Sequence, residues 1–219
     1  MATTVIVTRT GDAIVSGRMI GSSPTQAEPL NLGWGSGGIG SGSPYTAAKT
    51  DVAPFQEAAE ARVAGTSSQQ TTTFTNDTYQ VVATITSGSA QTIAEVFLSD
   101  TSSKPFSTTV ASGSTVIGSS SNTGLNTAAS YTPANNTYVQ IDTEVMQVTA
   151  GTGTTTLTVS RHQNGSTAIS SIAQGDVVTL GNPPGTTGNN GDLFVHATFS
   201  GLPLSNGDSL QSTVKVSFN

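Results

Sequence analysis

Few residues of this sequence have side chains suited to catalysis or metal binding, and they are widely separated. The 219 residues include two histidines, 13 acidic residues and no cysteine. His162 lies in a polar stretch typical of a turn, whereas His196 lies within an apolar run and is expected at a core edge or an interface. A metal site would need both histidines together with carboxylates from distant segments, so we predict no metal and no cofactor.

Two acidic residues have a spacing that suggests chemistry. Asp142 and Glu144 are two positions apart in a predicted strand, which places both on one face, and paired carboxylates can hydrolyse glycosides. Neighbours of this kind more often belong to a solvated face, so a glycan hydrolase is the weakest of three functional hypotheses. Residues 33–38 match a dinucleotide-binding glycine pattern, but further Gly, Ser and Pro follow where that pattern requires a helix. We therefore predict no enzymatic activity and no catalytic residues.

The composition narrows the class of protein further. Charged residues make up 9% of the chain, against about 25% in a typical soluble domain. Ser, Thr, Asn and Gln must therefore supply the polar surface, which is typical of a β-rich protein. The formal charge of −6 without a basic cluster argues against nucleic-acid binding, and no apolar run is long enough for a membrane span. The first residues lack the pattern of a signal peptide, so we expect synthesis in the cytoplasm.

Local patterns predict mostly short strands. We expect strands within 1–33, a glycine loop at 33–44 and strands within 66–86, including 71–75, broken by a turn at Asn76 and Asp77. The alanine-rich segment 45–64 is the only predicted helix, of one or two turns. The last strand, 209–218, alternates cleanly and ends with Phe218 on its apolar face.

The fold is expected to centre on a hairpin whose two strands are far apart in the sequence. The runs around Leu98 and Leu193 each read as a strand, and a hairpin loop normally has only ~2–5 residues. Between them lie four further predicted strands, at 115–118, 138–148, 155–161 and 176–180. Since loop-closure entropy grows slowly with length, a folded insertion at a hairpin tip is tolerable. We predict an all-β protein: a jelly-roll-like β-sandwich of residues 1–102 plus 191–219, with a small β-module, 103–190, inserted in a hairpin loop.

Several stretches share a family pattern: 57–65, 76–84, Ala-Glu-Val-Phe-Leu at 94–98, Gly-Asp-Leu-Phe-Val-His-Ala-Thr-Phe at 191–199, and 205–210. They resemble a β-domain of tailed-bacteriophage virion proteins, which usually has Glu-x-Gly-Leu-Phe-Asp, a short turn and Gly-x-Leu-x-x-Arg-x-x-Phe. Phe97 and Ser99 stand where that pattern has Gly and Phe, and the insertion occupies the turn. Residues 136–148 with 157–165 resemble a second β-module of phage structural proteins.

The resemblance implies a non-enzymatic virion protein, in the first place a capsid decoration (cement) protein. Such a protein is expected to form a homotrimer on the major capsid protein and to clamp neighbouring capsomers, with the first domain facing the shell and the insert projecting outward. We predict interface residues at Trp34, Phe97, His196 and Phe218. For Trp34, the chain's only tryptophan, the favoured interpretation is a core residue packed on the sheet, and a contact residue for a partner or a sugar is the alternative.

The second hypothesis is a tail, baseplate or fibre protein that binds host surface glycan through the insert. Aromatic rings stack on sugars, and the candidates for this role are Trp34, Tyr131 and Tyr138. Aromatic residues make up only 5% of the chain, which weakens this interpretation. Copy number separates the two hypotheses, because decoration requires hundreds of copies per particle and a tail role requires a handful.

Overall fold

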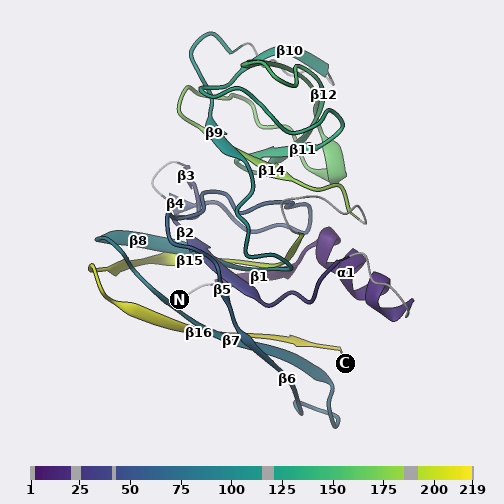
Figure 1. The fold of residues 1–219 in the computed structure, drawn as a ribbon, viewed down its shortest axis with the longest axis vertical. Coiled ribbons are helices and arrows are strands. Elements are labelled where there is room, and N and C mark those ends of the chain that lie inside the picture. The colour runs from purple at the N-terminus through teal and green to yellow at the C-terminus, as the bar shows by residue number, and fades with distance from the viewer. Residues whose placement is uncertain (1–2, 21–25, 41–42, 115–120, 185–191, 219) are drawn as a thin grey trace.

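The computed structural model describes residues 3–20, 26–40, 43–114, 121–184 and 192–218, which fold into strands with one α-helix and one short 3-10 turn. The chain forms two lobes, one above the other in Figure 1. We call the lower one the base lobe (3–99 and 192–218) and the upper one the inserted module (107–181). The predicted all-β sandwich fold is confirmed.

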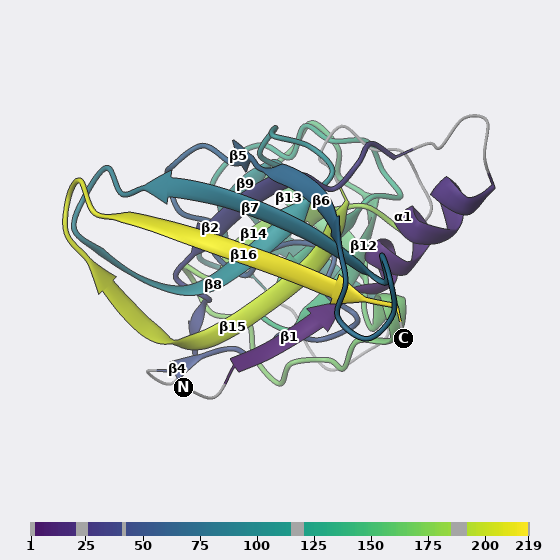
Figure 2. The same cartoon turned by 90° about the horizontal axis from the view of Figure 1, so that it is seen from below.

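The base lobe is an open half-barrel made of a five-stranded and a three-stranded antiparallel sheet (Figure 2). The two sheets enclose an apolar core that includes Leu32, Val81, Ile93, Leu98 and Phe194. The larger sheet has the order β1 (Thr3–Val7), β15 (Leu193–Leu204), β8 (Gln91–Ser99), β2 (Asn31–Gly35), β5 (Val63–Ala64). The smaller has the order β16 (Ser209–Ser217), β7 (Thr78–Thr86), β6 (Thr66–Gln70), and a separate pair joins β3 (Ile39–Gly40) to β4 (Ser43–Pro44).

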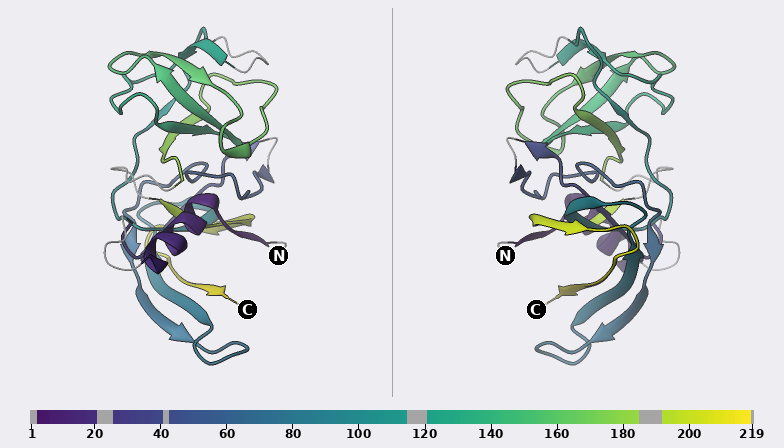
Figure 3. Two further views of the ribbon diagram at one scale, coloured as in Figure 1. Left: turned by 90° about the vertical axis from the view of Figure 1, so that its right-hand side faces the viewer. Right: turned by 90° about the vertical axis from the view of Figure 1, so that its left-hand side faces the viewer.

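Strands β8 and β15 form the hairpin that the sequence suggested. They pair antiparallel, with Ser99 opposite Leu193 and Leu98 opposite Val195, so Leu98 and Leu193 lie on neighbouring strands of one sheet. The chain leaves the base lobe after β8, builds the inserted module and returns at β15. Both ends of the described chain, β1 and β16, belong to the base lobe (Figure 3).

The inserted module is a six-stranded antiparallel sheet with a core of its own. Buried residues of that core include Leu125, Tyr131, Ile141, Met146 and Leu157. The sheet order is β10 (Ser121–Asn126), β13 (Thr156–Ser160), β12 (Glu144–Ala150), β11 (Tyr138–Ile141), β14 (Val177–Gly181), β9 (Ser107–Thr109), and the 3-10 turn η1 (Gln163–Gly165) follows β13. The predicted strand at 115–118 lies outside the described residues.

The single strand predicted at 138–148 is two strands, β11 and β12, joined in a tight hairpin. Asp142 adopts a φ of 51°, in the left-handed region that an Asp tolerates in turns. The chain therefore reverses at Asp142, and Ile141 pairs with Glu144.

We predicted only strands within 1–33, but Arg9–Met19 forms a helix, α1. Thr8 caps its N-terminus by accepting a hydrogen bond from the backbone N–H of Gly11, at 3.0 Å. A Cβ at Gly11 would lie 2.4 Å from the Phe194 carbonyl oxygen, so close packing requires the glycine. Within the described residues, no helix is both long and apolar enough to cross a membrane.

The helix predicted within 45–64 does not form, because side chains capture the backbone donors that a helix would need. The N–H groups of Phe55 and Gln56 donate to Glu95, and that of Val52 donates to Gln140. These residues run instead as loop and turns between the two lobes. The sequence suggested neither acceptor, because both lie far away along the chain.

Two further local predictions are corrected. The start of the predicted glycine loop is strand β2, where Gly33 and Gly35 lie against Phe97 and Glu95 of the neighbouring strand. The predicted strand at 71–75 is a turn held by Asp77, whose carboxylate accepts the backbone N–H groups of residues 72, 73 and 74. The turn expected at Asn76 and Asp77 is present, with Asn76 at a φ of 59°.

Candidate functional site

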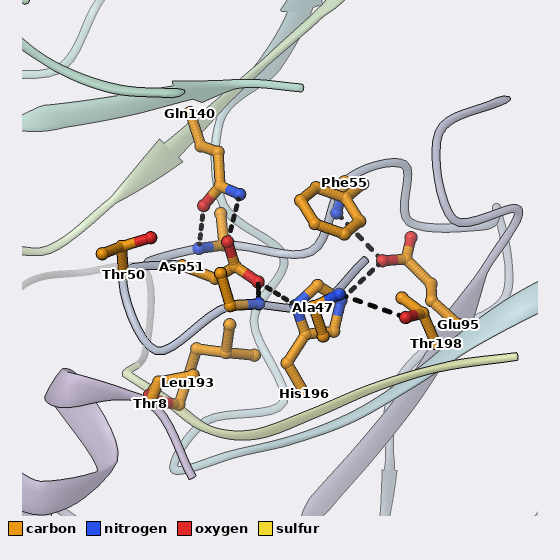
Figure 4. Close-up of polar contacts among 12 residues, drawn as sticks. Thr8, Ala47, Thr50, Asp51, Phe55, Glu95, Gln140, Leu193, His196 and Thr198 are labelled. Carbon is orange, nitrogen blue, oxygen red and sulfur yellow. Dashed lines mark hydrogen bonds and ion pairs between the residues drawn. The ribbon is translucent and has the colours of Figure 1, made fainter. Parts of the chain in front are cut away.

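A buried charged cluster joins the two lobes, and Figure 4 shows its members. His196 comes from β15, Glu95 from β8, Asp51 from the loop after β4, and Gln140 from β11 of the module. We call these four residues the junction cluster. All four side chains lie in the interior, with His196, Asp51 and Glu95 fully buried.

His196 is held between two carboxylates. Its Nδ1 lies 2.8 Å from Asp51 Oδ2, and its Nε2 lies 2.9 Å from Glu95 Oε2. Burial on its own disfavours the charged ring, but the hydrogen bonds and charges of Asp51 and Glu95 outweigh it and raise the pKa of His196 to about 9. His196 is therefore an imidazolium at neutral pH, and the cluster contains two carboxylates and one cation.

Further N–H donors satisfy the carboxylates. Asp51 accepts from Ala48 N at 2.8 Å and from Gln140 Nε2 at 3.1 Å. Glu95 accepts from Phe55 N at 2.9 Å and from Gln56 N at 2.8 Å. Because each buried oxygen has a donor, the desolvation cost of these charges is offset locally.

Gln140 extends the cluster into the inserted module. Its Oε1 accepts from the backbone N–H groups of Val52, at 2.9 Å, and Ala53, at 3.1 Å, while its Nε2 donates to Asp51. One side chain of the module thus satisfies three polar groups of the base-lobe loop. Both nitrogens of His196 are engaged, and the cluster is sealed from solvent. Through Gln140, the junction cluster connects the inserted module to the base lobe.

The paired-carboxylate interpretation of Asp142 and Glu144 is corrected. Glu144 is buried and forms a bidentate ion pair with Arg161, with Nε at 2.8 Å from Oε1. Asp142 lies in the β11–β12 turn and faces Tyr45, whose pKa is raised to about 12 by burial and then by Asp142. The two carboxylates serve separate structural contacts and do not share a face.

The predicted interface residues fall into two groups. Trp34, Phe97 and His196 are core residues, exposed by 2%, 0% and 0%, and the Trp34 indole donates to Glu60 at 3.1 Å. Phe218 is 60% exposed and presents its ring to solvent. Of the proposed sugar-stacking residues, Tyr131 is fully buried and Tyr138 half-buried.

An apolar groove of about 370 Å³ opens on the base lobe beside Phe218. Its lining comes mainly from α1, from β6, β7 and the turn between them, and from the chain end after β16. In Figure 1 the strands β6, β7 and β16 lie on the side of the base lobe away from the inserted module. Two of its lining residues, Met19 and Phe218, are strongly exposed, by 81% and 60%. The lining includes Ile14, Val15, Met19, Tyr79, Phe194 and Phe218.

A second hollow, of about 340 Å³, continues this surface between β1 and β16. Val7 of β1 and Val216 of β16 line it together with Met19 and Phe218. Both strands lie at sheet edges, each with a single described neighbour, so unpaired backbone edges border the apolar surface.

No family model, curated protein or solved structure matches the chain.

Sequence reasoning missed three members of the junction cluster, Asp51, Glu95 and Gln140. A signal for Glu95 was present, because the residue stands between Ala94 and Val96 in a strand with apolar residues on both faces. A carboxylate buried in such a strand requires a partner. Nothing in the sequence pointed to Asp51 as the second carboxylate that contacts His196.

Proposed function

We propose that this chain is a non-enzymatic structural protein of a tailed-phage virion, and that it decorates the capsid as a homotrimer. The observation that carries the proposal is the apolar groove with its exposed lining residues Met19 and Phe218. The sequence resemblance to phage virion β-domains supports it independently.

The physical argument concerns the cost of leaving this surface in water. Burying a large apolar side chain is worth about 1.5–3 kcal/mol, and several such side chains surround one groove. A contact with neighbouring subunits would recover that free energy. The low content of charged residues, 9%, also favours close packing of polar surfaces in an assembly.

The two-lobed arrangement suggests how such a protein would work. In this proposal the groove side of the base lobe faces the shell and neighbouring copies, and the module projects outward. The junction cluster would keep the lobes together under load. The mechanism is mechanical: apolar contacts and strand edges clamp adjacent capsomers against internal pressure.

The glycan-binding alternative is less favoured. Two of its three stacking residues, Trp34 and Tyr131, have no surface on which a sugar could lie. Tyr138 alone does not make the stacking platform that such recognition uses.

The test is to remove the protein from particles and measure heat resistance and DNA retention. Under this proposal, stripped particles lose DNA at lower temperature, and adding back the wild-type chain restores them. A double variant, Met19→Ser with Phe218→Ser, is expected not to rebind. Unchanged heat resistance after stripping would argue against a decoration role.

A further inference from the structure

Strand β1 is an edge strand that carries none of the features that usually protect a sheet edge. Its sequence is Thr-Thr-Val-Ile-Val, a run of β-branched residues without a charge, a proline or a glycine. Within the described chain it pairs only with β15, and Figure 2 shows it beyond β15 at the border of the larger sheet. An unprotected edge of this kind is a template on which another strand can pair.

The other edges of the three larger sheets are less suited to pairing within the described chain. Strands β5 and β9 are two and three residues long, and β6 is a polar run, Thr-Ser-Ser-Gln-Gln. Strand β10 is bulged between Thr123 and Leu125, and β16 carries Lys215. Short strands, bulges and lysines all discourage edge-to-edge pairing. The edge best suited to a further strand is therefore that of β1.

The hydrogen-bonding pattern of β1 shows which backbone groups face its free edge. The backbone N–H of Thr8 donates to the Phe194 carbonyl at 3.1 Å, which continues the antiparallel ladder between β1 and β15. Hydrogen-bonded positions alternate along an antiparallel strand, so the even-numbered residues of β1 bond to β15. The backbone N–H and C=O groups of the odd-numbered residues, Thr3, Val5 and Val7, point outward.

Val5 combines outward backbone groups with an exposed side chain. It is the middle residue of β1 and is 56% exposed. Its side chain shares a face with that of Val7, which lies opposite Val195 of the base-lobe core. Val5 therefore extends the apolar face of the sheet to an edge where the described chain leaves it largely uncovered.

We propose that β1 pairs antiparallel with β1 of a second copy of this chain, about a two-fold axis beside Val5. The two Val5 residues then lie directly opposite and exchange hydrogen bonds through their outward N–H and C=O groups. Thr3 of each strand lies opposite Val7 of the other. A two-fold contact requires a self-complementary surface, and an antiparallel pair of identical strands centred on their middle residue provides one.

The added strand also covers apolar surface. A strand at the free edge of β1 enters the space toward β16, where Val7, Met19, Val216 and Phe218 line the hollow of about 340 Å³. The two Val5 side chains lie on one face of the joined sheet and cover each other. This inference concerns the isolated chain and does not depend on the proposed role in the virion. Combined with the three-fold contact proposed there, it predicts assemblies of six copies.

The experiment measures the mass of the full chain in solution by size-exclusion chromatography with light scattering. The wild type should contain an even number of chains of 22.1 kDa. Val5→Lys and Val5→Glu should each halve the mass of the assembly, because like charges then lie directly opposite. An equimolar mixture of V5K and V5E should restore the full mass, since opposite charges then meet across the axis. Thr213→Lys, at an exposed position of the edge strand β16, is the control and should leave the mass unchanged.

An odd number of chains in the wild type at every concentration would overturn the proposal. So would an unchanged mass for V5K, or a mixture of V5K and V5E that stays at half mass. If the charged variants do not fold, Val5→Cys is the second variant. The chain has no cysteine of its own, and Cα atoms about 5.5 Å apart in a hydrogen-bonded pair suit a disulfide. Mild oxidation should link V5C chains in pairs but not T213C chains, and V5C chains that remain unlinked would contradict the contact.

Discussion

His196 Nδ1 lies 2.8 Å from Asp51 Oδ2, although 145 positions separate the two residues in the sequence. Asp51 belongs to the loop between the lobes, and His196 lies in the strand that returns from the inserted module. This contact, with Glu95 on the opposite side of the ring, ties the loop to the central sheet.

Replacing the imidazolium should destabilise the fold strongly. His196→Asn leaves Asp51 and Glu95 buried without their shared cation, and breaking a buried ion pair in this way costs about 3–5 kcal/mol. Urea unfolding of the full chain measures the loss. The matched control is His162→Asn, at an exposed turn position with a φ of 60° that Asn tolerates, and it should change stability by less than about 0.5 kcal/mol.

Stability should also fall on the alkaline side of neutrality. The pKa of His196 is raised from 6.5 to about 9 in the folded chain. The stabilisation is fully present below pH 6.5 and is lost as pH rises through 9, with a total of about 3 kcal/mol. Unfolding free energies measured between pH 6 and 10 should decline in the wild type. In H196N this part of the decline should vanish, and an equal decline in both proteins would refute the assignment.

Much of the strand content of the base lobe could be predicted from local sequence, because the strands are short runs with a recognisable residue pattern. The runs around Leu98 and Leu193 are rich in β-branched and aromatic residues, and their pairing was predictable from them. The Asp51–His196–Glu95 cluster was not predictable, since it depends on which distant loop packs over the sheet. A single histidine in a strand is compatible with either a core or an interface.

Gln140 should prove essential for coupling the module to the base lobe. Gln140→Leu leaves two backbone N–H groups and one Asp51 oxygen without partners, at a cost of about 2–4 kcal/mol. Limited proteolysis should then cut faster within residues 45–57. Gln147→Leu on the neighbouring strand, at a half-buried position, is the control and should change the rate little. Equal protection in both variants would show that Gln140 does not link the lobes.

Gly33 should tolerate no side chain. A Cβ at this position would lie 2.2 Å from the Phe97 ring, so Gly33→Ala must displace the ring or bend β2. Such overpacking costs about 1–3 kcal/mol, measurable by thermal unfolding. Gly88→Ala is the control, because its nearest atom would lie 3.7 Å away, an ordinary contact. A melting temperature for G33A equal to that of G88A would contradict this packing.

The helix wrongly predicted within 45–64 shows that helix propensity alone does not determine secondary structure. Alanine content favoured a helix within 45–64, but Glu95 and Gln140 accept the N–H groups that its ladder would use. Glycine content disfavoured a helix at 9–19, but Gly11 is required there by the approach of the Phe194 carbonyl. In both places tertiary contacts from distant residues outweighed the local preference.

The most direct test of the proposed function is the number of copies of this chain per purified particle, measured by quantitative mass spectrometry against the major capsid protein. Decoration of the shell predicts hundreds of copies, in a multiple of three. A handful of copies, located at the tail, would contradict the account and favour a tail or fibre role.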